Sequence, residues 1–254
     1  MSAVTERVVL SLADYVKECS DIEQASVPGR SNLFRGQRDG SKPLVPAIWR
    51  SPYIDTEVSR GEMGLESLES IMLHRYCTYA ASHFPPLINE GPRHEILWRK
   101  IVVAQHHGLP TRLLDWTLSP LVALFFAVEA KELAGVDSAV LVMKDMGGVP
   151  VSTFACRNEH PPKFTMSDDP LRDFGVLLPP LINQRMTAQA SVFTVSASPQ
   201  PLVPHLHIKI PSRASERIFR ELRMIGVDHG FIFPDLDGIA NRVRIEAARI
   251  GAFS

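Results

Sequence analysis

The sequence has few cysteines and none of the cysteine patterns that carry structural chemistry. Its three cysteines are isolated from one another and odd in number: Cys19, Cys77 and Cys156. A disulfide framework or a cysteine-based zinc site is therefore not expected, and the chain is predicted to belong to a reducing compartment. The histidines also lack the spacings of compact zinc sites, so no metal is expected.

Long apolar runs are missing as well. The longest, residues 121–128, is far shorter than the roughly 20 residues that cross a bilayer. Residues 1–9 contain a charged pair and no sustained apolar stretch, unlike a signal peptide. We therefore expect a cytoplasmic protein with no membrane partner. The net charge of −1 also gives no reason to expect non-specific binding to nucleic acid.

Three common sequence motifs are absent too. No P-loop and no Gly-x-Gly-x-x-Gly pattern occurs, and no Gly-x-Ser-x-Gly elbow of a serine hydrolase is present. What remains is an ordinary globular composition, with 45% hydrophobic and 22% charged residues in a chain of 254. We find no internal repeat and no linker, so we predict a single domain over residues 1–254.

Hydrophobic periodicity and capping signals predict an α+β fold, with small mixed or antiparallel sheets and flanking helices. The predicted helices cover residues 12–18, 62–82, 94–107, 120–133, 212–225 and 235–250. The predicted strands cover residues 32–37, 138–144, 191–195, 205–210 and 230–233. Ser11 and Ser119 are the expected N-caps of two of these helices, the second followed by a proline at the first helical position. Residues 40–52 and 161–180 are predicted to be irregular.

The strand Leu33-Phe-Arg-Gly-Gln37 carries an arginine among apolar residues. A guanidinium cannot discharge, so its burial requires an anionic partner, and its fork geometry suits a carboxylate or a phosphate. Gly36 has no side chain, so a ligand could approach the backbone closely at this position. Two interpretations remain open for Arg35: an anion-binding site, or a structural ion pair with an acid such as Asp115.

Polar side chains gather between two apolar helices, in a segment that we expect to be a loop. They are Gln105, His106, His107, Thr111, Arg112, Asp115, Trp116, Thr117 and Ser119. Such a loop often forms the wall of a binding site, although the same groups also cap helix ends and satisfy loop backbone. Trp116 could stack on a flat ligand ring, but large aromatic residues more often belong to the core.

Four segments in this order resemble the signatures of the FRG domain family. They are residues 33–37, residues 105–117 with 119–120 and 123–127, Arg185-Met-Thr-Ala-Gln189 with Phe193-Thr194, and residues 222–226 with 233–238. The resemblance spans about residues 30 to 240. FRG domains occur in bacteria and phages, in contexts suggestive of toxin or antiviral roles, and the motif alone does not define an activity.

A looser resemblance connects the strand around Arg35 to the first motif of many ADP-ribosyltransferases, and implies NAD as the substrate. The residues implied in holding NAD are Arg35, Gly36, Gln37, Arg112, Trp116, Thr117 and Ser119; those implied in the chemistry are Asp115, Gln189 and His106. Gln189 occupies the place of the family's glutamate, and an amide cannot act as a general base at neutral pH. A base would then come from Asp115 or a histidine.

Three hypotheses follow for the function. The first is an NAD-dependent ADP-ribosyltransferase with a protein or nucleic-acid acceptor, which predicts that Arg35, Asp115 and Gln189 converge on one cleft of nucleotide size. The second is a non-catalytic sensor or interaction module that binds a nucleotide or an anion in the same cleft. The third is a structural interaction protein in which Arg35 is paired in the core.

Overall fold

The computed structural model describes residues 4–50, 64–129, 135–147, 149–150, 175–179, 184–195 and 201–249. These residues form one eight-stranded mixed sheet with flanking helices, which confirms the predicted α+β class. The sheet order is β1-β8-β4-β2-β3-β7-β6-β5. The sheet is therefore continuous across the described part of the chain, where the sequence had suggested several smaller sheets.

The strands are β1 (Thr5–Val8), β2 (Ser31–Gln37), β3 (Leu113–Thr117), β4 (Ser138–Met146), β5 (Val149–Pro150), β6 (Gly175–Leu178), β7 (Ser191–Val195) and β8 (Leu206–Ile210). The helices are α1 (Leu12–Gln24), α3 (Gly64–Tyr79), α4 (Arg93–His106), α5 (Pro120–Val128), α7 (Gln184–Ala188), α8 (Ser212–Met224), α9 (His229–Ile232) and α10 (Leu236–Arg249). Short 3-10 turns lie at Ala47–Trp49, Ala81–His83 and Pro86–Asn89.

The sheet consists of two halves that meet at β2 and β3. In the first half, β2 and β8 both pair antiparallel with β4, and β1 runs parallel to β8. In the second half, β3 and β6 both pair antiparallel with β7, and β5 runs parallel to β6. Between the halves, only Phe34 of β2 and Thr117 of β3 stand in register. Beyond this pair the two strands separate.

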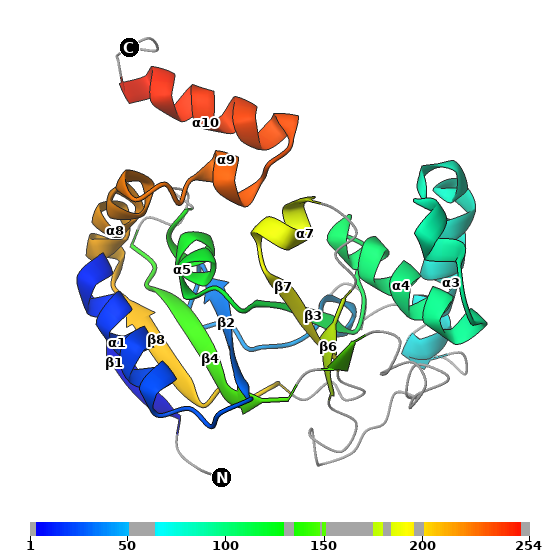
Figure 1. Ribbon diagram of the computed structural model, residues 1–254, viewed down its shortest axis with the longest axis horizontal. Coiled ribbons are helices and arrows are strands. Elements are labelled where there is room, and N and C mark those ends of the chain that lie inside the picture. Colours follow the sequence, from blue (N-terminus) through cyan, green and yellow to red (C-terminus); the bar gives the residue numbers. More distant parts are fainter. Residues whose placement is uncertain are drawn as a thin grey trace.

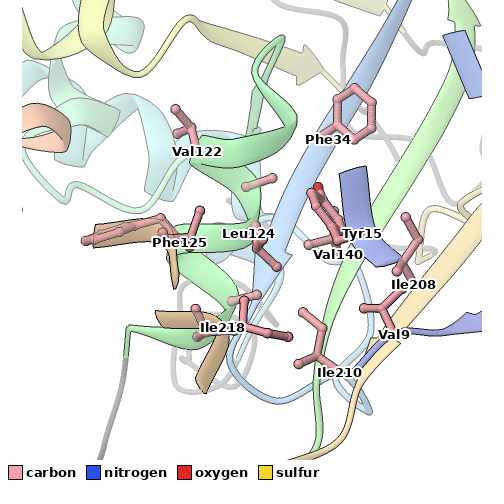
Figure 2. Packing of buried hydrophobic residues seen from close by; sticks show 14 of the residues in the cluster. Val9, Tyr15, Phe34, Val122, Leu124, Phe125, Val140, Ile208, Ile210 and Ile218 are labelled. Atoms are coloured by element: carbon pink, nitrogen blue, oxygen red, sulfur yellow. The ribbon is translucent and has the colours of Figure 1, made fainter. Parts of the chain in front are cut away.

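Each half of the sheet has its own helices. Figure 1 shows α1, α5 and α8 grouped over the first half, and α3 and α4 beside the second. The first group buries a cluster around Phe125 of α5, which includes Tyr15, Val140 and Ile218 (Figure 2). The second group buries Trp98 of α4 against β3 and β7. A third cluster, around Trp116, covers the opposite face of the sheet.

The local signals at helix starts are confirmed. The Ser11 side chain accepts a hydrogen bond from the Asp14 amide at the start of α1, at 3.1 Å. The Ser119 hydroxyl accepts from the Val122 amide at the start of α5, with proline at the first helical position. These side chains satisfy amides that a helix start otherwise leaves unpaired.

Several predicted elements were wrong. Residues 113–117, expected in a loop, form strand β3, because they pair with β7 along their whole length. Residues 230–233, expected to be a strand, lie mostly in helix α9, where Asp228 caps the turn by accepting from the Phe231 amide. Strand β1 was not predicted, and α1 continues to Gln24 instead of ending near residue 18. Of the segment 161–180, residues 175–178 form β6, and residues 161–174 and 180 lie outside the described residues.

No helix among the described residues is long and apolar enough to cross a bilayer.

Candidate functional site

A cavity of about 1080 Å³ opens where β2 and β3 separate. Its volume lies slightly above the range of roughly 300–1,000 Å³ that is typical of ligand pockets. Its walls come from β2, from the segment after β2, from β3, and from the ends of α4, α5 and α7. The residues that bear on the argument are Arg35, Arg38, Lys42, Trp49, Arg50, Gln105, His106, Asp115, Trp116, Thr117, Arg185 and Gln189.

The cavity is cationic, although the chain as a whole carries a net charge of −1. Five lysine or arginine side chains line it, namely Arg35, Arg38, Lys42, Arg50 and Arg185, against two aspartates, Asp39 and Asp115. Walls that concentrate charge of one sign raise the local concentration of ligands of the opposite sign. This excess of positive charge favours an anionic ligand.

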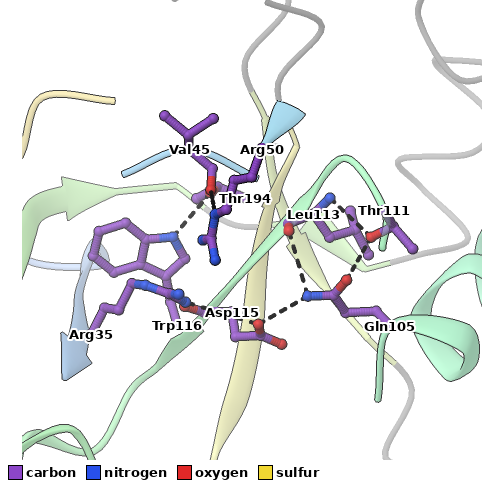
Figure 3. A network of polar contacts seen from close by, with 9 residues as sticks. All are labelled: Arg35, Val45, Arg50, Gln105, Thr111, Leu113, Asp115, Trp116 and Thr194. Atoms are coloured by element: carbon purple, nitrogen blue, oxygen red, sulfur yellow. Dashed lines mark hydrogen bonds and ion pairs between the residues drawn. The ribbon is translucent and has the colours of Figure 1, made fainter. Parts of the chain in front are cut away.

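Arg35 lies at the centre of the gap between the two halves of the sheet. Its Nη1 donates a hydrogen bond to the Asp115 carbonyl and lies 3.9 Å from the Asp115 carboxylate (Figure 3). The side chain is 20% exposed, and its Nε has no hydrogen-bond partner among the described residues. Burial lowers the pKa of Arg35, while Asp115 raises it and Arg50 lowers it further. Both interpretations of Arg35 are therefore compatible with the structure, because Arg35 lies close to Asp115 and also lines the cavity.

The carboxylate of Asp115 is held in place by a chain of hydrogen bonds from α4 (Figure 3). The Thr111 hydroxyl donates to Gln105 Oε1 at 2.6 Å, so the amide nitrogen of Gln105 points the other way. That nitrogen donates to the Asp115 carboxylate at 2.9 Å. The Asp115 side chain nevertheless remains 58% exposed, so the oriented carboxylate is accessible to a ligand.

His106 lies in the last turn of α4 and lines the same cavity. Burial lowers the pKa of His106, and the positive charge of Arg185 lowers it further, while Asp115 acts in the opposite direction. The ordinary histidine pKa already lies below 7, so the imidazole is neutral at neutral pH and can accept a proton.

Gln189 and Thr117 tie β3 to the turn before β7. The Thr117 hydroxyl donates to the Gln189 carbonyl at 2.6 Å and accepts from the Ser119 amide at 2.9 Å. The Gln189 side-chain nitrogen donates to the Ile232 carbonyl of α9 at 3.3 Å. Both residues line the cavity, but the Thr117 hydroxyl is already engaged in positioning the strand.

Arg112 and Ser119 do not lie where the sequence analysis had placed them. Arg112 is 1% exposed, lies outside the cavity lining, and donates from its backbone amide and its guanidinium to the carboxylate of Glu69 on α3. It is part of a buried ion pair and is not available to grip a diphosphate. Ser119 also lies outside the lining, and its hydroxyl caps α5.

Gly36, Gln37 and Trp116 line the cavity, but each has a structural reason for its identity. A Cβ on Gly36 would lie 2.0 Å from the Ala123 carbonyl oxygen, so the group that approaches Gly36 is the backbone of α5. The Gln37 side chain donates to the Lys42 carbonyl at 3.0 Å. Trp116 is 3% exposed and its indole nitrogen donates to the Thr194 hydroxyl, so its ring forms a wall of the cavity.

Four cationic residues of the cavity were not assigned a role from the sequence: Arg38, Lys42, Arg50 and Arg185. Arg185 lies in the third of the family-like segments, Arg185–Gln189, which could have been its signal. Arg50 follows the turn at residues 47–49, in a region predicted to be irregular, and no motif pointed to it. Among the described residues, no group of three or more His, Cys, Asp or Glu side chains could hold a metal ion.

The fold and the cavity define an α+β protein with a cationic cleft between the two halves of its sheet. Residues 30–134 match the family model of the FRG domain, which supports the resemblance seen in the sequence. The matched segment includes Arg35, His106 and Asp115, whereas Arg185 and Gln189 lie beyond it. Comparisons with curated proteins and with solved structures found no match.

Proposed function

We propose that the cavity binds NAD and that this protein transfers ADP-ribose from it to an acceptor. The observation that carries the proposal is that Arg35, Asp115 and Gln189, from three neighbouring parts of the sheet, line one cavity of about 1080 Å³. This is the convergence that the transferase hypothesis requires, and the volume accommodates a dinucleotide.

Each charged group of the cavity has a role in this reaction. The NAD diphosphate is an anion that lies against Arg35 and Arg50, whose guanidinium forks suit phosphate oxygens. The reacting ribose then lies beside Asp115, the exposed carboxylate that Gln105 orients. Trp49 and Trp116 supply flat apolar wall for the rings of the ligand.

The chemistry follows from the same placement. The bond between the nicotinamide nitrogen and the ribose C1′ breaks, and neutral nicotinamide leaves with the bonding electron pair. The positive charge that develops on the ribose is stabilised by the Asp115 carboxylate. An acceptor atom then forms a bond to C1′, and its proton passes to the neutral His106 imidazole. Gln189 replaces the glutamate expected from the looser resemblance, and its amide serves only to hold a ribose hydroxyl.

The test is the fate of NAD. We expect the protein to release nicotinamide from NAD, as followed by mass spectrometry, and to add ADP-ribose to an acceptor or to water. Arg35→Lys keeps the positive charge but loses the bidentate contact with the diphosphate, and should raise the KM for NAD by about tenfold. Asp115→Asn should lower kcat by about a hundredfold or more. Arg220→Gln, on the exposed side of α8, is the control and should change neither.

The second candidate function is a nucleotide sensor without turnover, which the glutamine at position 189 favours. In that case NAD raises the melting temperature of the wild-type protein but is recovered unchanged. If NAD neither stabilises the protein nor is consumed by it, both candidate functions are wrong.

A further inference from the structure

The cavity has a cation at its α7 end that the proposed binding of NAD leaves unused. Arg185 of α7 lines the cavity beside His106, and its charge lowers the pKa of that histidine. Asp115 influences both His106 and Arg35, whereas Arg50 acts on Arg35. Asp115 therefore interacts electrostatically with both Arg35 and the neutral His106, and Arg185 is a second permanent cation close to His106.

Arg185 differs from other arginines of the protein in its partners. Arg112 is paired with Glu69, and Arg38 is paired with Glu129. Among the described residues Arg185 has no carboxylate partner, and its Nε is buried without a hydrogen-bond partner. A partly buried guanidinium without a carboxylate partner in the described part of the chain is a suitable place for an anion from solution to supply the counter-charge.

The position of Arg185 is fixed by an aromatic ring. Its guanidinium carbon lies 4.6 Å from the centre of the Phe233 ring, in the geometry of a cation–π contact. Phe233 is held in a tight turn, because a Cβ on Gly238 would lie 1.8 Å from the Phe233 carbonyl oxygen. The guanidinium is thus backed on one face by the Phe233 ring.

We propose that Arg185, backed by Phe233 and flanked by His106, forms a second anion subsite that receives a phosphate of a nucleic-acid acceptor. A planar guanidinium is well suited to phosphate oxygens, and the adjacent rings suit a flat base. A hydroxyl or base nitrogen of the held nucleotide then faces the ribose C1′ beside Asp115 and gives its proton to His106.

The identification of this ligand as the acceptor rests on the proposed transfer function, whereas the anion subsite itself does not. Arg185 lies outside the segment that matches the FRG domain. Binding of the two ligands is measured in separate experiments. NAD is followed by calorimetry, and the nucleic acid by fluorescence anisotropy with a labelled single-stranded deoxythymidine decamer.

We expect Arg185→Gln to weaken binding of the decamer by about tenfold, as the loss of a charge-assisted contact implies, and to lower the affinity for NAD by no more than about twofold, through the smaller positive charge of the cavity. A decamer with an uncharged methylphosphonate backbone should bind weakly to the wild-type protein, and Arg185→Gln should not alter that binding. Phe233→Leu, which removes the ring but keeps an apolar side chain, should give a smaller loss. Arg220→Gln removes the same charge from the exposed face of α8 and should change the affinity less than twofold.

Three results would overturn the subsite. One is a decamer affinity of Arg185→Gln within twofold of the Arg220→Gln control. Another is a lower melting temperature of Arg185→Gln with unchanged affinity, which would make Arg185 a structural brace for Phe233. The third is Arg185-dependent binding of a phosphoserine peptide with no binding of the decamer. If the decamer depends on Arg185 while NAD neither binds nor reacts, the transfer function fails and the subsite stands.

Discussion

Replacing Arg112 with methionine should destabilise the protein strongly and leave the chemistry of the remaining folded molecules intact. The Arg112 guanidinium is buried, and Glu69, its partner on α3, is 5% exposed. Removing the cation leaves the carboxylate buried without a counter-charge, which costs about 3–5 kcal/mol. A typical domain is stable by only roughly 5–15 kcal/mol, so the loss would be a large part of the total.

The geometry of the pair provides a specific rescue. Glu69 Oε1 accepts from the Arg112 backbone amide at 3.0 Å, and Oε2 accepts from the guanidinium Nε at 2.7 Å. Adding Glu69→Gln to Arg112→Met removes the unpaired charge, while the amide oxygen can still accept from the backbone. We expect this double variant to recover most of the lost stability, with a coupling energy of about 2 kcal/mol or more.

Chemical denaturation followed by circular dichroism measures these differences directly. The Arg220→Met variant is the control, since an exposed substitution on α8 should change the free energy of unfolding by less than about 0.5 kcal/mol. If Arg112→Met unfolds like the wild type but loses affinity for NAD, Arg112 is a ligand-binding residue and the burial argument is wrong. A double variant no more stable than Arg112→Met would refute the charge argument specifically.

Three further predictions concern the packing and the protonation of the fold. Gly36→Ala should cost at least about 3 kcal/mol, because the new methyl group overlaps the α5 backbone; an alanine variant as stable as the wild type would exclude this close packing. Ser119→Ala should cost about 1 kcal/mol through the lost cap of α5, with unchanged NAD turnover per folded molecule, and reduced turnover would restore Ser119 as a ligand. Burial lowers the pKa of His229 in the folded state, so the unfolded state binds the proton first as the pH falls below 6.5, and stability decreases. His229→Gln should flatten the slope of unfolding free energy against pH between 7 and 5, and equal slopes would contradict this assignment.

The sequence predicted those elements whose signals are local. Strands β4 and β7 are short runs rich in β-branched residues, and the caps Ser11 and Ser119 lie directly before apolar helices. Such features depend on neighbouring residues along the chain, so no knowledge of the tertiary structure is needed to find them.

The missed strands depend on partners distant in the sequence. Strand β1 has the sequence Thr-Glu-Arg-Val and is exposed throughout, so only its pairing with β8 makes it a strand. Strand β3 follows a turn with Gly108 and Pro110, and its polar Asp115 resembled a loop residue until pairing with β7 fixed it. Conversely, the aromatic residues of 230–233 favoured a strand, but the Asp228 cap starts a helical turn there.

The same distinction between local signals and distant partners applies to the candidate site. Arg35 and Asp115 were recognisable because a charged residue beside apolar neighbours requires an explanation. The role of Arg112 was wrong because its partner, Glu69, is 43 positions away and no local spacing connects them. The role proposed for Arg185 depends on its contact with the Phe233 ring, which no local spacing in the sequence predicts.

The narrow join between β2 and β3 has a mechanical consequence. Phe34 and Thr117 form the one registered pair between two half-sheets that each have their own helices, and the cluster around Trp116 and the Arg35–Asp115 contact also cross the join. A ligand held by Arg35 on one half and Asp115 on the other adds a further tie across the join. Such a clamp should slow amide hydrogen exchange in both halves together, because neither half can then open without first releasing the ligand.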